Sequence, residues 1–574
     1  MKIAQWRSFL PGMALATLVA AAIFVYPLAV APRVPLLDPD EGLHAAIAQE
    51  MLDRGDWVVP RLFGRPFLDK PILYFWCEAA SLGLLGMSEV AVRLPGLLLG
   101  LAGAVTTAAL AWRMFDRRMG LVAGVCYATT ILPAALAQAA AHDVALVPWV
   151  NLALLLFWES DQSKIPNPQS PIPNPQSLIL HPWLLTALAG LVLGLAVLTK
   201  GLAGVALVGI AYGGYLVAAR RLRWAHSLRG ALALAVAAGA AAGWYLAVEH
   251  RSPGYLHYFF IERHLLGFAT ATQPHGGARW WYYLPALLVG GLPWIAYVPA
   301  ALGDAWRQQR SKVPAAAGGG QPLTLLASWL IGCTVFLSLG HSKMVTYIWP
   351  VFPALAILAA VAWARLIDGR LGQAARRWMA GVVWGSCLSG PIVLPALLWA
   401  VQHKTAVHFS GPAWTIAVLA GLTALMPLGC WVAGRPRAAW AWAALGMAAQ
   451  FAVALTIALP PVAQRQSARD LADYFNRLGR LPPRLFVVEE RIGSLVFYLD
   501  HDLRSKTREG QMLSLSLGPD QPPTVFGPDD LLAVPDRALA EALPRLGLAA
   551  TPYQQAGHYR IYPALEPSAR DPGS

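Results

Sequence analysis

The chain has 574 residues, of which 57% are hydrophobic and only 13% are charged, with a mean hydropathy of +0.49. Ordinary soluble domains carry about 25% charged residues, so the composition excludes a soluble globular protein and predicts a polytopic membrane protein. The excess of 44 Lys and Arg over 31 Asp and Glu lies in short clusters between apolar runs, which indicates membrane topology and no binding of nucleic acid.

Long apolar runs predict the membrane-spanning helices. A helix needs about 20 apolar residues to cross about 30 Å of hydrocarbon, and we count thirteen such runs. They lie near residues 9–30, 92–112, 119–139, 143–158, 181–199, 201–219, 229–248, 281–301, 322–340, 344–364, 379–400, 412–433 and 438–459. The first run is too long for a signal-peptide core of about 7–15 residues, so we expect it to be a retained span.

Basic clusters between the runs predict the orientation. With the N-terminus in the cytoplasm, five clusters fall on the cytoplasmic side, as the positive-inside rule requires. Their members are Arg113, Arg117 and Arg118; Arg220, Arg221 and Arg223; Arg307, Arg310 and Lys312; Arg365, Arg370, Arg376 and Arg377; and Arg435 and Arg437. The loop 31–92 and the tail after residue 460 then lie on the exoplasmic side, which is the periplasm of a bacterium.

The first exoplasmic loop, residues 31–92, concentrates charged side chains beside the membrane. Among these charged residues are Asp38, Asp40, Glu41, Glu50 and Asp69, together with Arg33 and Lys70. Asp40 and Glu41 begin a predicted interfacial helix, where acids commonly cap the helix or interact with its dipole. The alternative is a base or substrate anchor in a cavity at the membrane surface. Because charges beside hydrocarbon are costly, their concentration here favours a functional role.

Four charged residues, Lys70 among them, stand at predicted exoplasmic ends of spans. Asp143 begins the fourth run and is either a helix cap or a second carboxylate facing the same cavity as Asp40. Lys70, Lys200 and Lys343 each lie at the exoplasmic end of a span, where lysine often extends towards water. Three lysines on one face also predict a site for an anionic phosphate.

Two segments differ in composition from the apolar runs. Residues 161–178 contain Ile-Pro-Asn-Pro-Gln-Ser twice, which predicts a Pro-rich cytoplasmic linker without a packed core. Residues 461–574 combine an amphipathic helix pattern over 467–478, a short strand over 485–488 and a helix over 536–546. They predict a small α/β domain in the periplasm, next to a membrane domain over residues 1–460.

The exoplasmic loop 249–280 mixes aromatic, acidic and basic side chains, including Arg263, His264 and Arg279. Such residues suit a membrane-interface belt or a site for a sugar or lipid headgroup. Histidines without regular ligand spacing are weak indicators of a metal. No cofactor is required by these patterns, and the candidate ligands for a possible divalent metal are Asp40, Asp143 and His264.

Several motifs point to one family. Residues 40–51 read Asp-Glu-Gly-Leu-His-Ala-Ala-Ile-Ala-Gln-Glu-Met, which looks like the first-loop pattern Asp-Glu-x-x-Tyr-Ala-x-Ile-Ala-x-Glu-Met of lipid-carrier-dependent GT-C glycosyltransferases. The chain resembles especially the aminoarabinose transferase branch that modifies lipid A, with protein O-mannosyltransferases as more distant relatives. Further matches are 56–60, 64–71, Arg93-Leu-Pro95, Leu198-Thr-Lys200-Gly201, Tyr258-Phe-Phe, Leu292-Pro293-Trp294 and 342–353.

The chain also departs from the family pattern. His44 stands where the family often has Tyr, Asp69 where it often has Glu, and Gly267 where it tends to have Arg. The missing arginine bears on phosphate binding, for which Arg263 and Arg279 are the candidate replacements.

The resemblance implies a helical membrane enzyme that moves a sugar, 4-amino-4-deoxy-L-arabinose in the closest branch, from a polyprenyl (undecaprenyl) phosphate to lipid A or another periplasmic acceptor. It implies Asp40 as base or transition-state stabiliser, Asp143 as a second carboxylate and Glu41 as a positioning residue. The implied substrate and phosphate contacts are Lys70, Lys200, Lys343, Arg33, Arg263, Arg279 and Tyr347. The absence of a Gly-rich nucleotide loop from the sequence agrees with a lipid-linked donor.

Other functions fit a chain with about a dozen spans. A sister enzyme would glycosylate protein or glycan in place of lipid A. A transporter or flippase would place its ionisable or broken-helix site near the middle of the membrane, whereas the acids here gather at one face. A membrane scaffold whose tail binds a partner would leave the first loop without a role.

Overall fold

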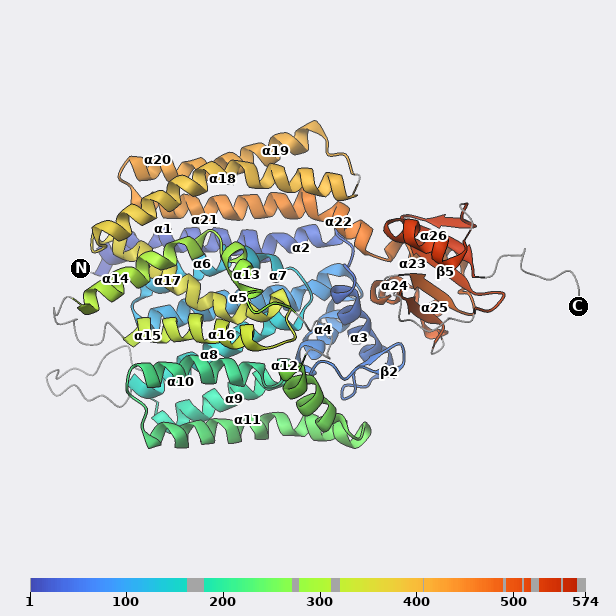
Figure 1. Cartoon of the computed structure of the whole chain (residues 1–574), viewed down its shortest axis with the longest axis horizontal. Helices are drawn as coiled ribbons and strands as arrows, with labels where there is room; N and C mark the ends of the chain where they lie inside the picture. The colour runs from blue at the N-terminus through green and yellow to red at the C-terminus, as the bar shows by residue number, and fades with distance from the viewer. Residues whose placement is uncertain are drawn as a thin grey trace, which may run out of the picture. The chain divides into compact units, whose positions relative to one another are not determined.

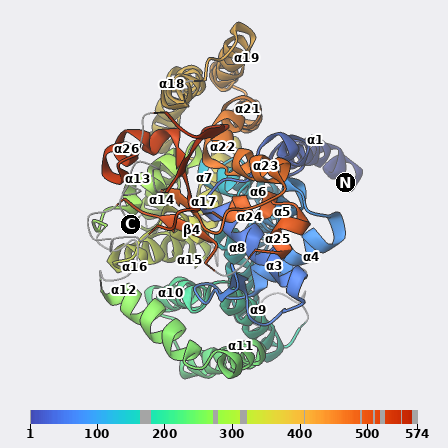
Figure 2. The ribbon, with the colours of Figure 1, turned by 90° about the vertical axis from the view of Figure 1, so that its right-hand side faces the viewer.

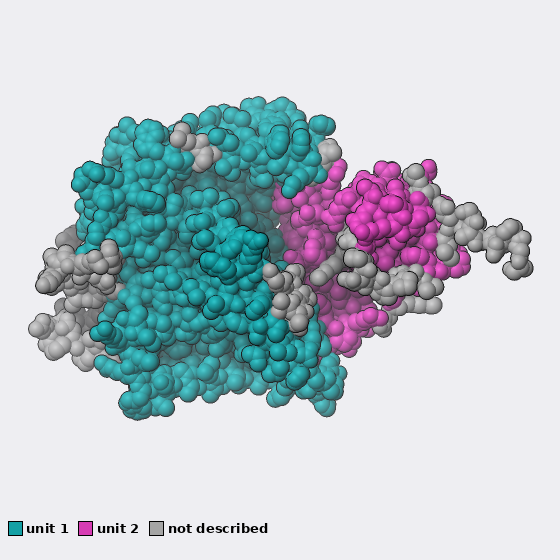
Figure 3. All heavy atoms as spheres, viewed as in Figure 1, with its two compact units in different colours: residues 1–29, 68–74, 96–458 teal, residues 30–67, 75–95, 459–574 magenta. Residues whose placement is uncertain are grey.

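The computed structural model describes residues 2–162, 180–270, 278–310, 321–405, 407–488, 492–507, 510–517, 526–548 and 551–564. The predicted linker 161–178 therefore lies outside the described residues, apart from its first two. The chain divides into two compact units, coloured in Figure 3. Unit 1 consists of residues 1–29, 68–74 and 96–458, and unit 2 of residues 30–67, 75–95 and 459–574.

Unit 1 is a helical bundle (Figure 1). Its elements are α1 (Lys2–Ala20), η1 (Ala21–Val25), α2 (Tyr26–Val30), α5 (Glu89–Met114), α6 (Arg117–Ala128), α7 (Ile131–Leu136), α8 (His142–Gln162), α9 (Pro182–Lys200), α10 (Ala203–Ala218), α11 (Trp224–Arg251), η3 (His257–Leu266), α12 (Gly267–Ala269), α13 (Tyr283–Gly290), η4 (Trp294–Tyr297), α14 (Val298–Arg310), α15 (Gln321–Ala327), η5 (Ser328–Gly332), α16 (Cys333–Leu339), η6 (Val345–Val351), α17 (Phe352–Ile367), α18 (Gln373–Thr405), α19 (Gly411–Leu422), η7 (Thr423–Leu425), α20 (Met426–Val432), α21 (Pro436–Val453) and η8 (Ala454–Ala458). Helices α2, α4 (Leu73–Leu85) and α5 each have residues in both units.

Helix α17 forms the centre of unit 1. Every residue from Phe352 to Ala364 is buried, and the helix packs against α6, α14, α15 and α21. Its sequence is apolar on all sides because a helix surrounded by other helices has no face in contact with water. In the end-on view of Figure 2, α9 and α11 lie together on one side of the bundle, and α18, α19 and α21 on the other.

The described residues contain ten helices long and apolar enough to cross a membrane, or eleven if one bent pair counts as a span. The multi-pass character is confirmed, but three of the thirteen predicted runs differ. The run 281–301 forms two helices that meet at 94°, with Gly291 and Pro293 at the break, where proline removes a backbone donor. The run 201–219 gives the 16-residue α10.

The run 119–139 is interrupted between α6 and α7. The hydroxyl of Thr129 donates to the carbonyl of Val125 and that of Thr130 to the carbonyl of Cys126, both at 2.7 Å. These side chains compete with the backbone for helical acceptors, and α6 ends at Ala128. A hydropathy count does not detect this interruption because threonine changes the mean hydropathy very little.

Ends of helices that carry predicted cytoplasmic arginines lie together in unit 1. Arg113 pairs with Glu159 of α8 at 2.7 Å, and Arg118 pairs with Asp368, directly after α17, at 2.8 Å. The clusters at 113–118 and 365–370, predicted to share one side of the membrane, are thus neighbours in space.

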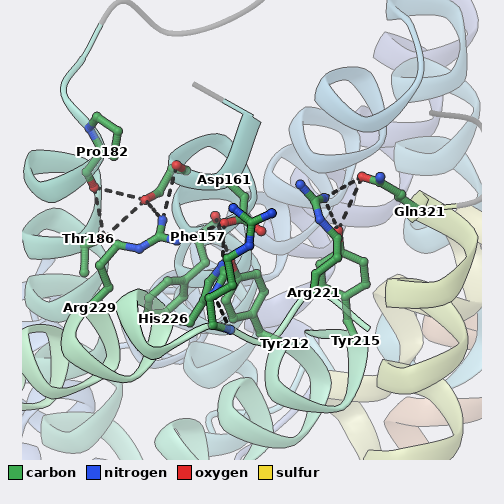
Figure 4. A network of polar contacts seen from close by, with 12 residues as sticks. Phe157, Asp161, Pro182, Thr186, Tyr212, Tyr215, Arg221, His226, Arg229 and Gln321 are labelled. Atoms are coloured by element: carbon green, nitrogen blue, oxygen red, sulfur yellow. Dashed lines mark hydrogen bonds and ion pairs between the residues drawn. The ribbon is translucent and has the colours of Figure 1, made fainter. Parts of the chain in front are cut away.

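A buried polar network joins the end of α8 to the starts of α9 and α11 (Figure 4). Asp161 accepts from Arg229 at 3.1 Å and contacts His226 at 3.0 Å. Arg229 also donates to the hydroxyl of Ser160 at 2.7 Å, and that hydroxyl lies 3.0 Å from the carbonyl oxygen of Pro182. These hydrogen bonds compensate the charged groups for their loss of water. The network therefore joins the end of α8, at Ser160, to the start of α9, at Pro182.

Unit 2 combines short helices with a five-stranded sheet. Its elements are η2 (Ala31–Arg33), α3 (Asp40–Arg54), β1 (Arg61–Leu62), β2 (Arg65–Pro66), α4 (Leu73–Leu85), α22 (Leu459–Gln466), α23 (Arg469–Leu478), β3 (Leu485–Val488), α24 (Gly493–Tyr498), α25 (His501–Ser505), β4 (Met512–Leu515), β5 (Leu531–Pro535), η9 (Asp536–Ala538), α26 (Leu539–Leu546), β6 (Gln554–Ala556) and β7 (Tyr559–Pro563). The strand order is β4-β3-β5-β7-β6. Strand β3 is parallel to β4 and β5, and β7 is antiparallel to β5 and β6.

The sheet has a core on each face. Leu485 and Val487 of β3 pack with α23 and α24, whereas Phe486 and Val488 pack with α26. All four are buried, because alternate residues of a strand point to opposite faces and both faces are covered. The small α/β fold expected for the tail is confirmed.

The domain boundaries differ from the predicted division at residue 460. Unit 2 begins its last segment at Leu459 but also includes residues 30–67 and 75–95 of the first loop. The reason is that α24 of the tail packs on α3 of the loop. The loop is therefore structurally part of the unit that contains the tail.

Candidate active site

Helix α3 begins at Asp40, where the sequence predicts it to begin. Asp40 is exposed, and its carboxylate stands in the first helical turn, where the helix dipole favours a negative charge. Pro39 occupies the N-cap position and supplies no side-chain hydrogen bond. Asp40 is thus placed as a solvent-facing acid in unit 2.

Glu41 faces the interior of unit 2. Its carboxylate accepts from both Nε and Nη2 of Arg93, at 2.9 and 2.7 Å, and from the backbone N–H of Leu37 at 3.0 Å. Arg93 also donates to the carbonyl oxygens of Val34 and Pro35 at 2.7 and 3.1 Å. A buried carboxylate in a bidentate pair is fixed in place, and the Glu41 oxygens are occupied by Arg93 and by the backbone of Leu37.

Unit 1 brings together Asp143, Lys200 and Tyr347, three of the residues expected at the site. Asp143, in the first turn of α8, forms an ion pair with Lys200, the last residue of α9. The Lys200 ammonium lies 4.0 Å from the centre of the Tyr347 ring, a distance at which the ring face attracts a cation. Lys70 is close enough for its charge to act on Lys200.

Asp69, next to Lys70, is anchored to the π-helical segment η3. The hydroxyl of Tyr258 donates to its carboxylate, and Arg263 lies 3.1 Å from its other oxygen. Burial, and then the hydrogen bond to Asp69, raise the pKa of Tyr258 to about 12. Tyr258 is therefore protonated at neutral pH and remains a donor to Asp69, which fixes the backbone that carries Lys70.

His264 supports the end of α9. Its Nδ1 lies 2.8 Å from the carbonyl oxygen of Phe259 and its Nε2 lies 3.5 Å from that of Lys200. Burial lowers the pKa of His264, so the ring is neutral at neutral pH. The adjacent Gly201 has φ +61°, and a Cβ there would overlap the imidazole ring. Only glycine allows this close approach without strain.

Other expected phosphate ligands have different contacts. Lys343 is buried, and its Nζ donates to the carbonyl oxygen of Ala278 at 3.0 Å; burial lowers the pKa of this lysine. Arg279 lies over the ring of Trp281 at 5.8 Å. Arg33 is exposed and belongs to unit 2.

The candidate metal ligands do not form a cluster. Within the described part of the chain, no three His, Cys, Asp or Glu side chains form a group that could hold a metal ion. Asp143 is paired with Lys200, and His264 with backbone carbonyl groups.

Three residues with contacts described above received no individual role from the sequence: Arg93, Asp69 and Tyr258. Each stands inside a matched motif, so a signal for them exists. Their roles depend on partners 52 and 189 residues away in the chain, which spacing alone does not reveal.

Sequence comparisons find proteins that are similar to part of this chain. Residues 69–164 match the model of the dolichyl-phosphate-mannose-protein mannosyltransferase family. The undecaprenyl phosphate-alpha-4-amino-4-deoxy-L-arabinose arabinosyl transferase of Aeromonas salmonicida is 33% identical over 374 residues, which are 64% of this chain and 63% of that protein. That of Aeromonas hydrophila is 31% identical over 385 residues, or 66% and 65% of the two chains. The aligned stretch thus spans less than two thirds of either relative.

Solved structures extend the similarity over the whole fold. The crystal structure of ArnT from Cupriavidus metallidurans bound to undecaprenyl phosphate matches with a TM-score of 0.70 and 23% identity, covering 96% of this chain and 98% of that one. The Archaeoglobus fulgidus oligosaccharyltransferase matches with a TM-score of 0.51 and 14% identity, covering 88% and 64%. The expected fold and the resemblance to aminoarabinose transferases are both confirmed.

Proposed function

We propose that this chain, an aminoarabinose transferase-like membrane protein, is a glycosyltransferase that moves a sugar from a polyprenyl phosphate to an acceptor at the exoplasmic surface. The supporting observation is the group formed by Asp143, Lys200 and Tyr347, with Lys70 nearby, at one end of an apolar bundle. Aminoarabinose as the sugar, undecaprenyl phosphate as the carrier and lipid A as the acceptor are the choices that the named relatives favour.

The chemistry of transfer explains why acid and base groups stand together. An acceptor oxygen forms a bond to the anomeric carbon, while the bond from that carbon to the phosphate oxygen breaks and its electrons leave with the lipid phosphate. Positive charge develops on the sugar and negative charge on the phosphate. We assign Asp143 to the sugar side, and Lys70 and Lys200 to the phosphate side.

Asp40 is assigned the role of base or transition-state stabiliser, and Glu41 positions it. A hydroxyl acceptor would pass its proton to Asp40. A phosphate acceptor is already ionised, so Asp40 would then orient it or stabilise the sugar cation. Lys343, Arg33, Arg263, Arg279 and Tyr347 are further candidates for substrate contacts.

We also propose the membrane orientation given by the basic clusters: an inner-membrane protein with its N-terminus in the cytoplasm and residues 461–574 in the periplasm. In unit 1, the pairs of Arg113 and Arg118 lie at the end of the bundle opposite the Asp143–Lys200 pair. The positive-inside rule places that arginine-rich end in the cytoplasm.

A second candidate is transfer to protein, favoured by the match of residues 69–164 to the mannosyltransferase family. This reaction would use the same site and a polyprenyl-phosphate hexose. The two candidates differ in donor and acceptor, and both differ from a flippase, which would form no new glycosidic bond.

The test is incubation of the purified protein with a panel of polyprenyl-phosphate sugars and with lipid A or an unfolded peptide mixture, followed by mass spectrometry. We expect lipid A to gain one aminoarabinose per transfer, and Asp40→Asn to abolish the product while donor binding and protein yield persist. Glycosylated peptide would select the second candidate. Absence of any product with every donor would contradict a glycosyltransferase, and normal turnover by Asp40→Asn would remove Asp40 from the mechanism.

A further inference from the structure

The tail of unit 2 makes direct contact with the turn that precedes Asp40. The backbone N–H of Ser494, in α24, donates to Oδ1 of Asp38 at 3.1 Å, and the Ser494 hydroxyl donates to Oδ2. The same hydroxyl accepts from the backbone N–H of Ala468 at 2.8 Å. Ser494 is completely buried and Asp38 is half-buried, and a hydrogen bond to a charged group is stronger than one between neutral groups.

Backbone contacts hold the same turn. The N–H of Asp38 donates to the carbonyl oxygen of Gln466 at 2.9 Å, and the N–H of Glu41 donates to that of Leu37 at 3.0 Å. The chain before Asp40 is therefore bonded to the tail through both the main chain and the side chain of Asp38.

The turn that follows Asp40 also lies against α24. A Cβ added to Gly493 would overlap backbone atoms of Gly42 and Leu43, and one added to Gly42 would overlap the backbone nitrogen of Ser494. The two helices thus approach at a distance that only a pair of glycines permits. Asp40 lies between two residues, Asp38 and Gly42, that both contact α24.

A further contact ties the tail to the loop and to the start of α5. The Tyr498 hydroxyl accepts from the N–H of Leu36 at 2.9 Å and donates to Glu89 at 3.0 Å. Arg469 of α23 also pairs with Glu89, at 3.0 Å. Tail residues thus hold the loop at Leu36 as well as at Asp38.

From these contacts we infer that Ser494 and Gly493 are positioning residues for Asp40, so that the α/β tail fixes the first turn of α3 for sugar transfer. The inference depends on the proposed function, in which Asp40 acts on the reacting groups. Catalytic groups need positions fixed to within about 0.5 Å. Arg93 fixes the neighbouring Glu41 from the side of α5, and α24 supplies the second support.

The test compares two polar interactions between the tail and the segment that contains α3. Ser494→Ala removes the hydroxyl hydrogen bond to Asp38 and leaves the backbone one. Arg504→Ala removes the Arg504–Asp53 pair, 3.0 Å long, near the other end of α3. We expect Ser494→Ala to lower kcat about tenfold or more with the donor KM unchanged, since misplacement of about 1 Å can cost 10²-fold. Arg504→Ala should keep kcat within about twofold, because this pair holds the end of α3 that lies away from Asp40.

Two further measurements isolate positioning from simple loss of stability. Hydrogen exchange at the amides of residues 41–43 should accelerate in Ser494→Ala but not in Arg504→Ala. Asp38→Ala combined with Ser494→Ala should lose no more kcat than Asp38→Ala alone, because Asp38→Ala already removes both hydrogen bonds from Ser494 and partners in one bond are not additive. If Ser494→Ala does not fold, Asp38→Asn retains the acceptor for the Ser494 N–H and gives the milder version of the same comparison.

The outcomes separate the inference from the proposed function. A wild-type protein without transferase activity contradicts the function, while the exchange rates still test the contact between α24 and α3. Unchanged exchange at residues 41–43 in the Ser494 and Asp38 variants overturns the inference. So does a loss of kcat that Arg504→Ala reproduces, or a loss that appears in KM alone.

Discussion

At the residue scale, the Asp143–Lys200 pair has to satisfy two requirements. The side chains of Asp143 and Lys200 are only 8% and 15% exposed, so each needs the other to compensate for lost water. In the proposed reaction the same ammonium faces a phosphate, which would draw it partly away from Asp143. Phosphate binding would therefore partly release the Asp143 carboxylate, which is then available to the sugar side of the proposed reaction.

Because each buried charge needs its partner, we expect loss of Lys200 alone to destabilise the protein more than loss of both charges. Lys200→Met leaves the buried Asp143 carboxylate without its partner and should destabilise the protein by about 3 kcal/mol. Adding Asp143→Asn removes the uncompensated charge and should restore most of the loss, although both variants should be inactive. Denaturant unfolding of the purified proteins measures the difference. A double variant no more stable than Lys200→Met would show that the pair does not act as a unit.

Glu78 offers a second residue-scale prediction. It is completely buried in α4, and neither carboxylate oxygen has a hydrogen-bond partner among the described residues. Burial, and then the charge of Glu41, raise the pKa of Glu78 well above its ordinary value. The folded protein therefore keeps a proton that the unfolded chain releases above its ordinary pKa of about 4.3.

The sign of the pH dependence follows directly. The protonated Glu78 contributes fully to the free energy of unfolding below the pKa that Glu78 has in the unfolded chain. This contribution is lost as the pH rises through the higher pKa that Glu78 has in the folded protein. The loss is at most about 1.4 kcal/mol per pH unit. Glu78→Gln should remove this slope, so the difference between its melting temperature and that of the wild type should grow with pH. Asp502→Asn, at a 90% exposed carboxylate, is the control. A constant difference for Glu78→Gln would mean that the carboxyl is already ionised in the folded protein.

At the element scale, the end of α9 shows how one backbone conformation positions two side chains. Gly201 has φ +61° and ψ −141°, a combination that is essentially restricted to glycine. Directly before it, the carbonyl group of Lys200 faces His264, while the Lys200 ammonium reaches Asp143. The conformation of Gly201 thus sets where α9 stops and where Lys200 points.

Gly201→Ala should therefore cost about 1–3 kcal/mol of stability and reduce transferase activity, because the added methyl group displaces His264 and the end of α9. Gly209→Ala, in the middle of α10, meets no atom within 4 Å of its Cβ and should be neutral or slightly stabilising. Unfolding midpoints and turnover of the two variants give the comparison. Equal effects would show that the end of α9 tolerates a side chain.

The elements also show which features a sequence can predict. Ten spans follow from hydropathy, because long apolar helices need only length and composition. Hydropathy does not detect the interruptions at Thr129–Thr130 and Gly291–Pro293, because a few residues change the mean hydropathy of a run very little. Asp40 and Lys200 were found from a motif and from positions at span ends. Ser494, 456 residues from Asp38, lies in no recognised pattern, because only the tertiary fold brings the two together.

At the scale of the whole molecule, the first loop and the C-terminal tail fold within one unit. Residues 30–67 and 75–95 fold with residues 459–574, and hydrogen bonds from Ser494 to Asp38 and from Leu36 to Tyr498 join the two regions. The loop and the tail must therefore be on the same side of the membrane. Any topology that separates them is incompatible with unit 2.

The proposed orientation can be tested with single cysteines at exposed positions. Asp502→Cys lies in the tail, and Ala433→Cys lies after α20, beside the basic residues Arg435 and Arg437. With the half-buried Cys77 and Cys430 replaced by serine, a membrane-impermeant maleimide should label residue 502 in intact spheroplasts. It should label residue 433 only after permeabilisation, since the positive-inside rule retains arginine-rich loops in the cytoplasm. The opposite pattern would place Asp40 in the cytosol and remove the basis for transfer to a periplasmic acceptor.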